Sequence, residues 1–286
     1  MALALGRAVT LLSVISPVFN SARYLPAALA SVAAIQTPHE HIVIDGGSTD
    51  GSVELLGRSS AQWVSEPDRG QTHAVNKGLA RASGELLAWL NGDDEYIPDA
   101  VDRAVAQLEQ NPEVMAVYGG MAVIDEGGDV RRTYIPAAWS WRRYLLLGDY
   151  IPTPTFIFRR GLLEERGLLD ERWQDAADYD FYLRLLHGVR VERMTEAVVR
   201  FRFHHDSKTA SNVWLQQDEA LAIRLQWSRG RVDRATMIGF DRAKRAILPR
   251  ISPWPATIAD DDGQTGAKLV ATLDRVRAAR NHAHRN

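Results

Sequence analysis

The chain has 286 residues with 45% hydrophobic and 24% charged side chains, a composition that supports a packed core and argues against wholesale disorder. Its formal net charge of -2 at pH 7 argues against nucleic acid as the main partner, because phosphate binding normally requires a basic excess. The sequence contains no cysteine, which excludes disulfides, a thiol nucleophile and any zinc site built on thiolates. This usage fits a reducing cytoplasm.

The apolar start, MALALGRAVTLLSVISPVF, resembles a signal peptide only in part. It lacks a positively charged first region, and its apolar run ends at Ser16-Pro17 instead of a small-residue cleavage site. No stretch of about 18 uninterrupted apolar residues occurs, so we expect no membrane-spanning helix. We therefore expect a cytoplasmic protein.

The first 118 residues alternate between short apolar runs typical of buried strands and segments with helical spacing of apolar residues. The expected strands are 9–15, 41–44, 62–64, 86–90 and 114–118. The expected helices are 24–35, 53–56, 72–82 and 98–109. This order predicts an α/β fold, because strand-helix-strand units with right-handed crossovers build a parallel sheet covered by helices.

Beyond Gly119-Gly120 the alternation loosens, and we expect a loop-rich stretch containing WSWRRYLLL. A strand over 155–158 and a helix beginning near Ala177 follow, and residues 216–250 have helical character. Segment 228–250 carries seven basic residues against two aspartates, a local basic excess. The expected division is a domain over 1–215, with halves 1–118 and 119–215, and a helical C-terminal appendage over 216–286.

Acidic and small residues follow the predicted strands, at the sheet edge where open α/β sheets bind ligands. Asp45-Gly46-Gly47 follows the second strand, and Asn91-Gly92-Asp93-Asp94 follows the fourth. Neighbouring carboxylates repel one another unless a cation or hydrogen-bond donors compensate them. A Mg²⁺ or Mn²⁺ ion takes one or two carboxylates and completes its shell with water and phosphate oxygens, so the pattern predicts a phosphorylated substrate. Asp45 could equally cap a turn, and Thr49 or Asp50 could cap the helix near Ser52.

Two common nucleotide-binding patterns are absent from the chain. Neither SPVFNSA nor GGSTDG supplies the G-x-G-x-x-G sequence of dinucleotide-binding folds, which disfavours a dehydrogenase. The phosphate-binding loop G-x-x-x-x-G-K-S/T is also missing, which disfavours the usual NTPases.

The series VISPVFN, IVIDGGSTDGS, SEPDRGQTHAVNKGLARASGELLAWLNGDD and DAADYDFYLRL resembles family 2 glycosyltransferases of the GT-A fold over about residues 9 to 210. Each motif is weak alone, but four in order at compatible spacing are specific, and they agree with the predicted sheet. The resemblance implies a glycosyltransferase that moves a sugar from a nucleoside-diphosphate donor to an acceptor hydroxyl with inversion.

The resemblance also implies which residues bind the donor: Pro17, Phe19, Asn20, Asp45, Gly47, Asp68, Lys77, Asn91 and Asp94. The family's Asp-x-Asp motif, which holds Mn²⁺ or Mg²⁺ and the diphosphate, maps onto Asn91-Gly92-Asp93. The first acid is replaced by Asn91, so we assign the metal mainly to Asp93, with Asp94 as alternate ligand or sugar contact. Val75 stands where many relatives carry arginine, and we expect Lys77 or Arg81 to contact the phosphate instead.

The family's catalytic base maps onto Ala176-Ala177-Asp178-Tyr179-Asp180, and we expect Asp178 to take the proton of the acceptor hydroxyl. Asp178 could also be the N-cap of the following helix. Asp180 is expected to be a first-turn acid favoured by the helix dipole.

A histidine near the metal or diphosphate maps by resemblance onto His204 of FRFHHDSKTAS, and Lys208 is a candidate phosphate contact. His204 could equally be a surface residue. Trp139 and Trp141 could line the site of a glycan or lipid-linked acceptor. They could also, with the basic segment 228–250, rest peripherally on the inner face of the membrane, or simply pack in a core.

The resemblance favours cell-surface polysaccharide or glycolipid assembly as the setting. Two other functions stay open from the sequence. A sugar nucleotidyltransferase would need a glycine-rich basic loop after the first strand, and Ser16 to Ala22 has no glycine, lysine or arginine. A catalytically degenerate nucleotide-sugar-binding relative is suggested by Asn91 and Val75, whereas the retained Asp93 and Asp178 argue for an enzyme.

Overall fold

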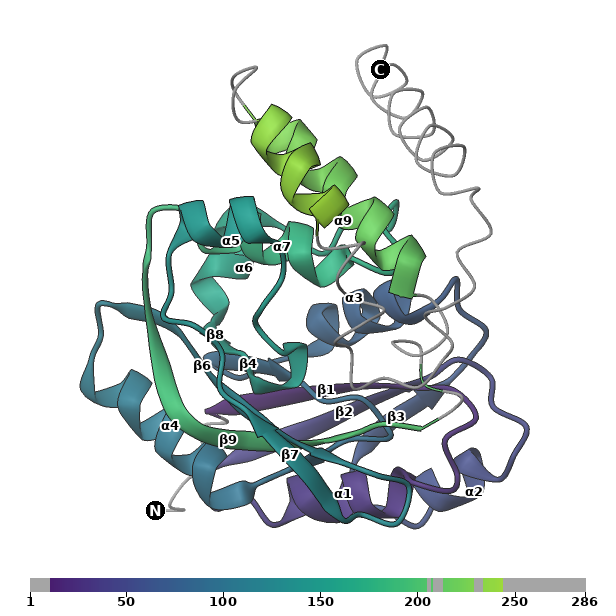
Figure 1. Cartoon of the computed structure of the whole chain (residues 1–286). Helices are drawn as coiled ribbons and strands as arrows, with labels where there is room; N and C mark the ends of the chain where they lie inside the picture. The colour runs from purple at the N-terminus through teal and green to yellow at the C-terminus, as the bar shows by residue number, and fades with distance from the viewer. Residues whose placement is uncertain (1–10, 205–206, 208–212, 229–233, 244–286) are drawn as a thin grey trace, which may run out of the picture. The chain divides into compact units, whose positions relative to one another are not determined.

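The structure, a computed structural model, describes residues 11–204, 207, 213–228 and 234–243 (Figure 1). The chain divides into two compact units, each drawn from three separate segments. The sheet unit takes the described residues of Met1–Ala138, Ile151–Leu168 and Gly188–Arg202, and the helical unit those of Trp139–Tyr150, Leu169–His187 and Phe203–Asn286. This division differs from the linear boundaries expected at 118 and 215, because the chain passes repeatedly from one unit to the other.

The sheet unit contains one sheet with the strand order β3-β2-β1-β4-β8-β6-β9-β5, and β7 pairs with β6. Its strands are β1 Leu12–Val18, β2 His39–Asp45, β3 Gln62–Ser65, β4 Leu86–Trp89, β5 Glu95–Tyr96, β6 Val114–Ile124, β7 Val130–Tyr134, β8 Ile157–Arg159 and β9 Arg190–Arg202. Strands β3, β2, β1 and β4 are parallel, as are β6 and β9, whereas β8 is antiparallel to both neighbours. The expected α/β fold with a parallel-rich central sheet and flanking helices is confirmed.

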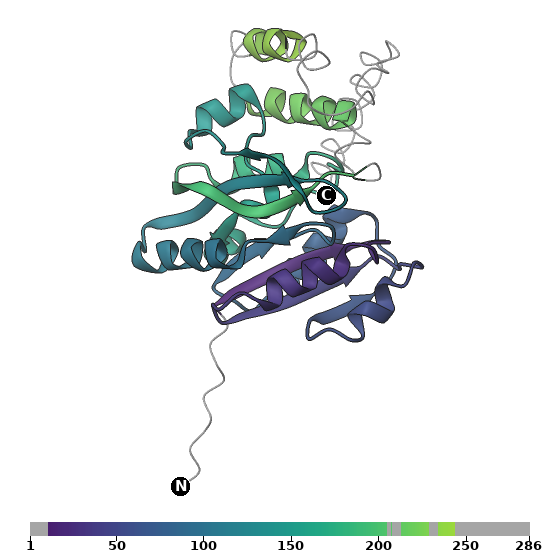
Figure 2. The ribbon, with the colours of Figure 1, turned by 60° about the horizontal axis from the view of Figure 1, so that its bottom comes forward.

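Helices cover both faces of the first strands, with α1, α2 and α4 on one face and α3 on the other (Figures 1 and 2). These helices are α1 Leu25–Ala33, α2 Ser52–Leu56, α3 Gln71–Arg81 and α4 Pro98–Gln110; η1 Thr153–Thr155 and α6 Arg160–Arg166 complete the unit. Successive residues of β1 pack against opposite faces of the sheet. Val14 packs with Val32 of α1, whereas Ile15 lies directly against Gly78 of α3, where any side chain would collide with it.

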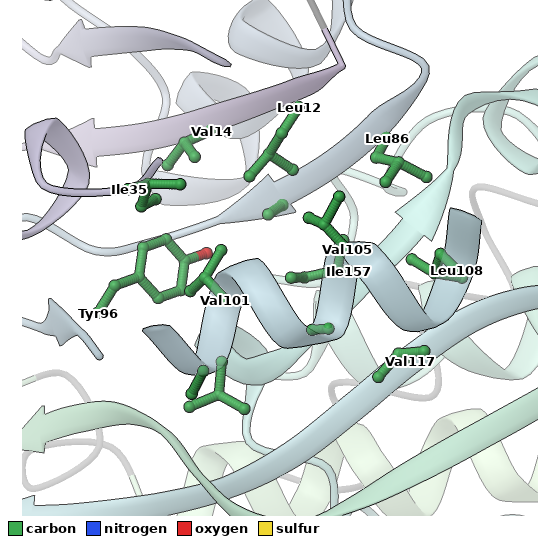
Figure 3. Close-up of a cluster of buried hydrophobic side chains, with 14 of the residues drawn as sticks. Leu12, Val14, Ile35, Leu86, Tyr96, Val101, Val105, Leu108, Val117 and Ile157 are labelled. Atoms are coloured by element: carbon green, nitrogen blue, oxygen red, sulfur yellow. The ribbon is translucent and has the colours of Figure 1, made fainter. Parts of the chain in front are cut away.

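One extensive core cluster joins β1, β4 and β6 to helix α4 (Figure 3). Val101, Val105 and Leu108 recur on one side of α4 and are fully buried against this sheet face. Burial of each such side chain stabilises the fold by roughly 1.5–3 kcal/mol. The regular spacing that predicted the helix is therefore the spacing that buries it.

The expectation of a loop-rich stretch after Gly119-Gly120 is wrong, because β6 continues through both glycines to Ile124 and pairs with β7 and β9. A Cβ at Gly119 would lie 3.2 Å from the Glu196 carbonyl, and one at Gly120 would lie 2.6 Å from the Tyr134 carbonyl. The glycines thus permit close strand approach instead of ending the strand. The long strand β9 is charge-rich and lacks a clean apolar alternation, which is why the sequence did not predict it.

The helical unit contains α5 Trp141–Leu147, α7 Ala177–Leu185, α9 Val213–Trp227 and a helix at 234–243. The segment WSWRRYLLL is thus helical, with the Ser140 hydroxyl accepting a bond from the Arg143 N–H at its start. The helix expected near Ala177 is confirmed. None of the helices in the described part of the chain is long and apolar enough to cross a bilayer.

Candidate functional site

The loops after β1, β2 and β3 begin side by side, because Val18 pairs with Asp45 and Asp45 pairs with Ser65. A Cβ at Gly46 would lie 2.7 Å from Asp68 Oδ2 and 3.4 Å from the Phe19 ring. Absence of a side chain at position 46 therefore lets Phe19 and Asp68 come together beside the backbone. The sheet unit thus brings Phe19 and Asp68, two residues predicted to bind the nucleotide-sugar, to the same edge of the sheet.

The Asp45 carboxylate is fully buried and serves the loop that follows it. Asp45 Oδ2 accepts bonds from the N–H groups of Gly47 (3.1 Å) and Ser48 (3.0 Å) and from Ser65 Oγ (2.6 Å), and Oδ1 accepts from Ser48 Oγ. Gly47 has a φ of 88°, a conformation that glycine adopts without strain. In this arrangement Asp45 shapes the turn, as the turn-capping alternative proposed. Its role toward a nucleoside stays a prediction.

Asn20 joins the first two loops. Its N–H donates to Ser48 Oγ (2.7 Å), and its Oδ1 accepts from the Thr49 N–H (2.9 Å). Its φ of 48° is in the left-handed region, which asparagine tolerates better than most residues. The adjacent Phe19 is 63% exposed, whereas Pro17 is buried within β1. An exposed aromatic ring at this edge offers a flat apolar surface to a ligand.

The helix α2 begins after Gly51, so neither Thr49 nor Asp50 is its N-cap residue. Asp50 still organises the loop, since its carboxylate accepts from the N–H groups of Ser52 (3.0 Å) and Ala22 (2.8 Å). Asp50 thus has the expected structural role at the start of α2, although it lies one position before the N-cap residue.

Asp68 and Lys77 lie on either side of the start of α3. Asp68 Oδ1 accepts a bond of 2.7 Å from the Gly70 N–H, directly before the helix. Lys77 Nζ lies 2.8 Å from Glu66 Oε1, and its hydrogen bond and charge lower the pKa of Glu66. To contact a phosphate, the Lys77 ammonium group has to exchange its ion pair with Glu66 for one with the phosphate. Val75, which stands where many relatives carry arginine, is buried in α3.

The loop after β4 holds Asn91 and Asp94 firmly. Asn91 Oδ1 accepts from Gln71 Nε2 (2.8 Å) and Trp89 Nε1 (2.9 Å), and Asn91 Nδ2 donates to Asp94 Oδ2 (3.0 Å). Asp94 is 1% exposed, and burial, together with the nearby charge of Asp93, raises its pKa. The oxygens of both residues are therefore engaged by protein donors.

Asp93 differs from Asp94 because it stays partly exposed. Within the described residues, no group of three or more His, Asp or Glu side chains is arranged to hold a metal ion alone. One accessible carboxylate is nevertheless a donor set that suits Mg²⁺ or Mn²⁺, which fills its remaining positions with water and phosphate oxygens. The donor chemistry of this loop thus fits a divalent cation, and Asp93 is its partly exposed carboxylate.

Arg202, which the sequence did not single out, ties the acidic loop to the end of β9. It is 4% exposed; its N–H donates to Asp94 Oδ1 (2.9 Å) and its Nε to the Asp93 carbonyl (3.1 Å). Its Nη1 donates to the Asp125 carbonyl (3.0 Å), and its Nη2 pairs with the Glu95 carboxylate. A buried arginine with this many acceptors fixes the loop backbone. Because Arg202 lies far from Asp93 in the sequence, no local motif connected the two residues.

A pocket of about 430 Å³ lies next to Arg202. It is lined by Arg23, Tyr24, Ala27, Glu95, Glu126, Gly127, Gly128, Arg200 and Arg202. The guanidinium groups of Arg23 and Arg202 lie 5.0 Å and 4.8 Å from the centroid of the Tyr24 ring. None of the residues predicted to bind the donor lines this pocket.

Asp178 belongs to the helical unit and is partly buried in the first turn of α7. The alternative that Asp178 is the N-cap is wrong, since the N-cap is Ala176, whose short side chain caps nothing. Asp178 Oδ1 accepts a bond of 2.8 Å from the Tyr179 N–H. Asp180 is buried and lies 2.8 Å from Arg184 Nε, which agrees with the structural role expected for it.

The aromatic residues of the helical unit pack together. Trp141 Nε1 donates to the Leu183 carbonyl (3.0 Å), and its ring lies 5.6 Å from that of Trp227 and 4.9 Å from that of His187. Trp139 lies 5.3 Å from the buried Tyr144 ring. These contacts favour the core-packing alternative for both tryptophans.

His204 is also in the helical unit and is partly exposed; its carbonyl accepts from the Ser207 N–H (3.1 Å). Lys208 lies outside the described residues, as does most of the basic segment 228–250. Of the basic residues of that segment, Arg234 is described with its Nε donating to Ser228 Oγ (2.9 Å).

Comparison with known sequences gives a consistent result. The family model for glycosyl transferase family 2 matches residues 13–166. An uncharacterized glycosyltransferase of Mycobacterium tuberculosis (strain ATCC 25618 / H37Rv) is 37% identical over 179 residues, covering 60% of this chain and 67% of that protein. One of Rickettsia conorii is 27% identical over 218 residues, covering 71% of this chain; the matched part is 36% of that relative's length.

Solved structures show the same architecture. S. aureus TarS 1-349 in complex with UDP-GlcNAc superposes with a TM-score of 0.62 at 17% identity, covering 94% of this chain and 81% of that one. The mannosyltransferase PcManGT from Pyrobaculum calidifontis in complex with GDP-Man and Mn²⁺ gives 0.58 at 18% identity, covering 93% and 87%. At such identities the likeness concerns the fold, and it confirms the expected GT-A architecture.

Proposed function

Because this chain belongs to glycosyl transferase family 2, we propose that it moves a sugar from a nucleoside-diphosphate donor to an acceptor hydroxyl with inversion at the anomeric carbon. The observation that carries the proposal is the contrast within the acidic loop. Asn91 and Asp94 are engaged in hydrogen bonds within the protein and Asp94 is buried, whereas the Asp93 side chain of the same loop is partly exposed.

The sheet unit binds the donor in this proposal. The Phe19 ring stacks on the base, and Asn20, Asp45 and Gly47 shape the nucleoside pocket, with Asp68 beside them. Asp93 holds Mn²⁺ or Mg²⁺, which neutralises charge on the departing diphosphate. The nucleotide-sugars present in the TarS and PcManGT structures, and the Mn²⁺ of the latter, support this donor class.

The helical unit supplies the base. Asp178 accepts the proton of the acceptor hydroxyl as the hydroxyl oxygen attacks the anomeric carbon, and the nucleoside diphosphate leaves with the bonding electrons. His204 is a second candidate for the metal or diphosphate. The acceptor is a glycan or lipid-linked glycan in cell-surface assembly, with the protein acting in the cytoplasm or peripherally at the inner face of the membrane.

Calorimetric titration of UDP and GDP with Mn²⁺, then with EDTA, tests the donor site. We expect binding that needs the metal and that Asp93→Ala abolishes, with Asp99→Ala, an exposed acid of α4, as the matched control. Tight nucleotide binding indifferent to both metal and Asp93 would contradict the metal-assisted mechanism. Metal-dependent binding without any turnover of UDP- or GDP-sugars would favour a degenerate binding protein, which the engaged oxygen of Asn91 keeps as the second candidate.

A further inference from the structure

A carboxylate from α9 holds the backbone that leads into α7. Glu219 is 6% exposed, and its Oε2 accepts from the N–H groups of Gln174 (3.0 Å), Asp175 (2.8 Å) and Ala176 (3.0 Å). Three successive backbone donors on one carboxylate oxygen form a specific arrangement, because hydrogen bonds to an ionised acceptor are about twice as strong as neutral ones.

These donors immediately precede the residue proposed as the base. Ala176 is the N-cap of α7 and offers no capping side chain, and Asp178 follows two positions later. The start of a helix leaves backbone N–H groups without intrahelical partners; the Ala176 N–H is one of them, and because it is buried it needs an acceptor. Glu219 supplies it from a helix more than forty residues further along the chain.

Other residues of α9 make separate packing contacts within the helical unit. On the same helix α9, Arg224 NH2 lies 3.0 Å from Asp241 Oδ1, and both side chains are almost fully buried. Trp227 of α9 packs on Trp141 of α5. Neither pair supplies an acceptor to the N–H groups of Gln174–Ala176, so loss of the Arg224–Asp241 pair tests general packing of α9 apart from the role of Glu219.

We infer that Glu219 is a positioning residue for catalysis, holding the Gln174–Ala176 backbone so that Asp178 projects from a fixed helix start. This rests on the proposed function, in which Asp178 is the base. The family model ends at residue 166, so the inference assigns part of the catalytic machinery to a helix beyond the matched region. The segment expected to be an appendage therefore contributes to turnover.

Misplacing a catalytic group by about 1 Å costs on the order of 10²-fold in rate. We expect Glu219→Ala to lower kcat for hydrolysis of UDP-glucose or GDP-mannose, whichever nucleotide binds, by about 10²-fold. Glu219→Gln keeps one acceptor oxygen and should give an intermediate loss. Donor KM should stay within about twofold in both, since the nucleotide-binding residues belong to the sheet unit.

Arg224→Met is the matched control, because it breaks a buried ion pair on the same helix without removing an acceptor from Gln174–Ala176. All rates are divided by the binding-competent fraction, taken from the stoichiometry of calorimetric nucleotide titration. The inference expects a graded loss of corrected kcat in Glu219→Gln and Glu219→Ala, and a normal corrected kcat in Arg224→Met. If Glu219→Ala does not fold, Glu219→Gln decides.

Asp178→Asn separates this inference from the function on which it rests. Loss of turnover in Asp178→Asn with normal corrected kcat in the Glu219 variants would overturn the positioning role alone. Retained turnover in Asp178→Asn would instead overturn the assignment of the base. Equal losses of corrected kcat in Arg224→Met and Glu219→Gln would assign Glu219 to general packing and also overturn the inference.

Discussion

The sheet unit and the helical unit build their candidate residues in different ways. In the sheet unit, Asp45 accepts hydrogen bonds from the N–H groups of residues two and three positions later. In the helical unit, the backbone before Asp178 depends on Glu219, which lies 43 to 45 positions from its partners. A site shaped by near neighbours leaves a recognisable motif, whereas one shaped by distant neighbours leaves a single residue without context.

The same contrast occurs within the sheet unit itself. Asp93 and Asp94 are adjacent, yet Asp94 is buried under the Arg202 backbone and the Asn91 amide while Asp93 stays partly exposed. Two adjacent acidic residues therefore differ in exposure and hydrogen bonding, because Asn91 and Arg202 pack on one of them. The following predictions separate the two units, and then the two acids, by experiment.

The largest effect is expected in the helical unit. Asp178→Asn should lower turnover of the nucleotide-sugar by about 10³-fold, because a positioned general base contributes about 10²–10⁴-fold. Nucleotide affinity, which we propose to be a property of the sheet unit, should not change. The measurement is kcat by nucleoside diphosphate release beside calorimetric Kd. A variant that loses nucleotide binding to the same extent would break the proposed division of roles.

The next effect concerns Arg202. Arg202→Met should lower the free energy of unfolding by about 3 kcal/mol, since it leaves Glu95 and the Asp93 carbonyl without their buried partner. Chemical denaturation measures this. Arg200→Met is the control, because Arg200 is half-exposed and lies 3.7 Å from Glu95, so a loss below about 1 kcal/mol is expected. Equal losses in both variants would refute the special role of Arg202.

The two acids of the loop should separate in metal dependence. Asp93→Ala should weaken Mn²⁺-dependent nucleotide binding at least about tenfold with little change in stability, because a partly exposed ligand is lost. Asp94→Asn should instead lower stability by about 1–3 kcal/mol, because one of its buried donors loses its acceptor. Calorimetry and denaturation on both variants test this pair. The reverse pattern would make Asp94 the metal ligand.

The smallest effect near neutral pH is a pH dependence in the sheet unit. Burial, with a smaller contribution from the charge of His39, lowers the pKa of His41 to about 3. Between that value and the unfolded-state pKa the unfolded chain binds the extra proton, so stability falls as pH falls, by about 1.4 kcal/mol per unit below about pH 6.5.

His41→Gln should flatten this slope while an amide group replaces the ring beside Ser16 Oγ, which lies 2.9 Å from His41 Nε2. Denaturant unfolding at pH 4 to 7 measures the slope in both proteins. An unchanged slope in the variant would show that other groups govern the acid limb.

The sequence predicted much of the sheet unit because its elements are short, apolar and separated by turn residues. Strands β2 to β4 and helices α1 to α4 lie where the periodicity placed them, whereas β1 continues through Ser16-Pro17 to Val18 and so ends three residues later than expected. The sequence did not predict strand β9, because its charged residues give no clean apolar alternation and their burial depends on neighbouring segments. Gly119-Gly120 led to the wrong prediction of a strand end, because glycine occurs both where a strand ends and where two strands approach closely. The sequence predicted the residues of the acidic loop, but it did not predict that Asn91 and Asp94 are hydrogen-bonded to other protein groups.

The sequence by itself determined the family, the fold class and the order of the acidic motifs, because these depend on local periodicity and on residues near one another in the chain. Only the tertiary structure decided which acid stays accessible, that Arg202 pins the acidic loop and that Glu219 holds the start of α7. Burial and hydrogen-bond satisfaction depend on distant segments meeting in space, and no local pattern records which distant residue will supply the partner.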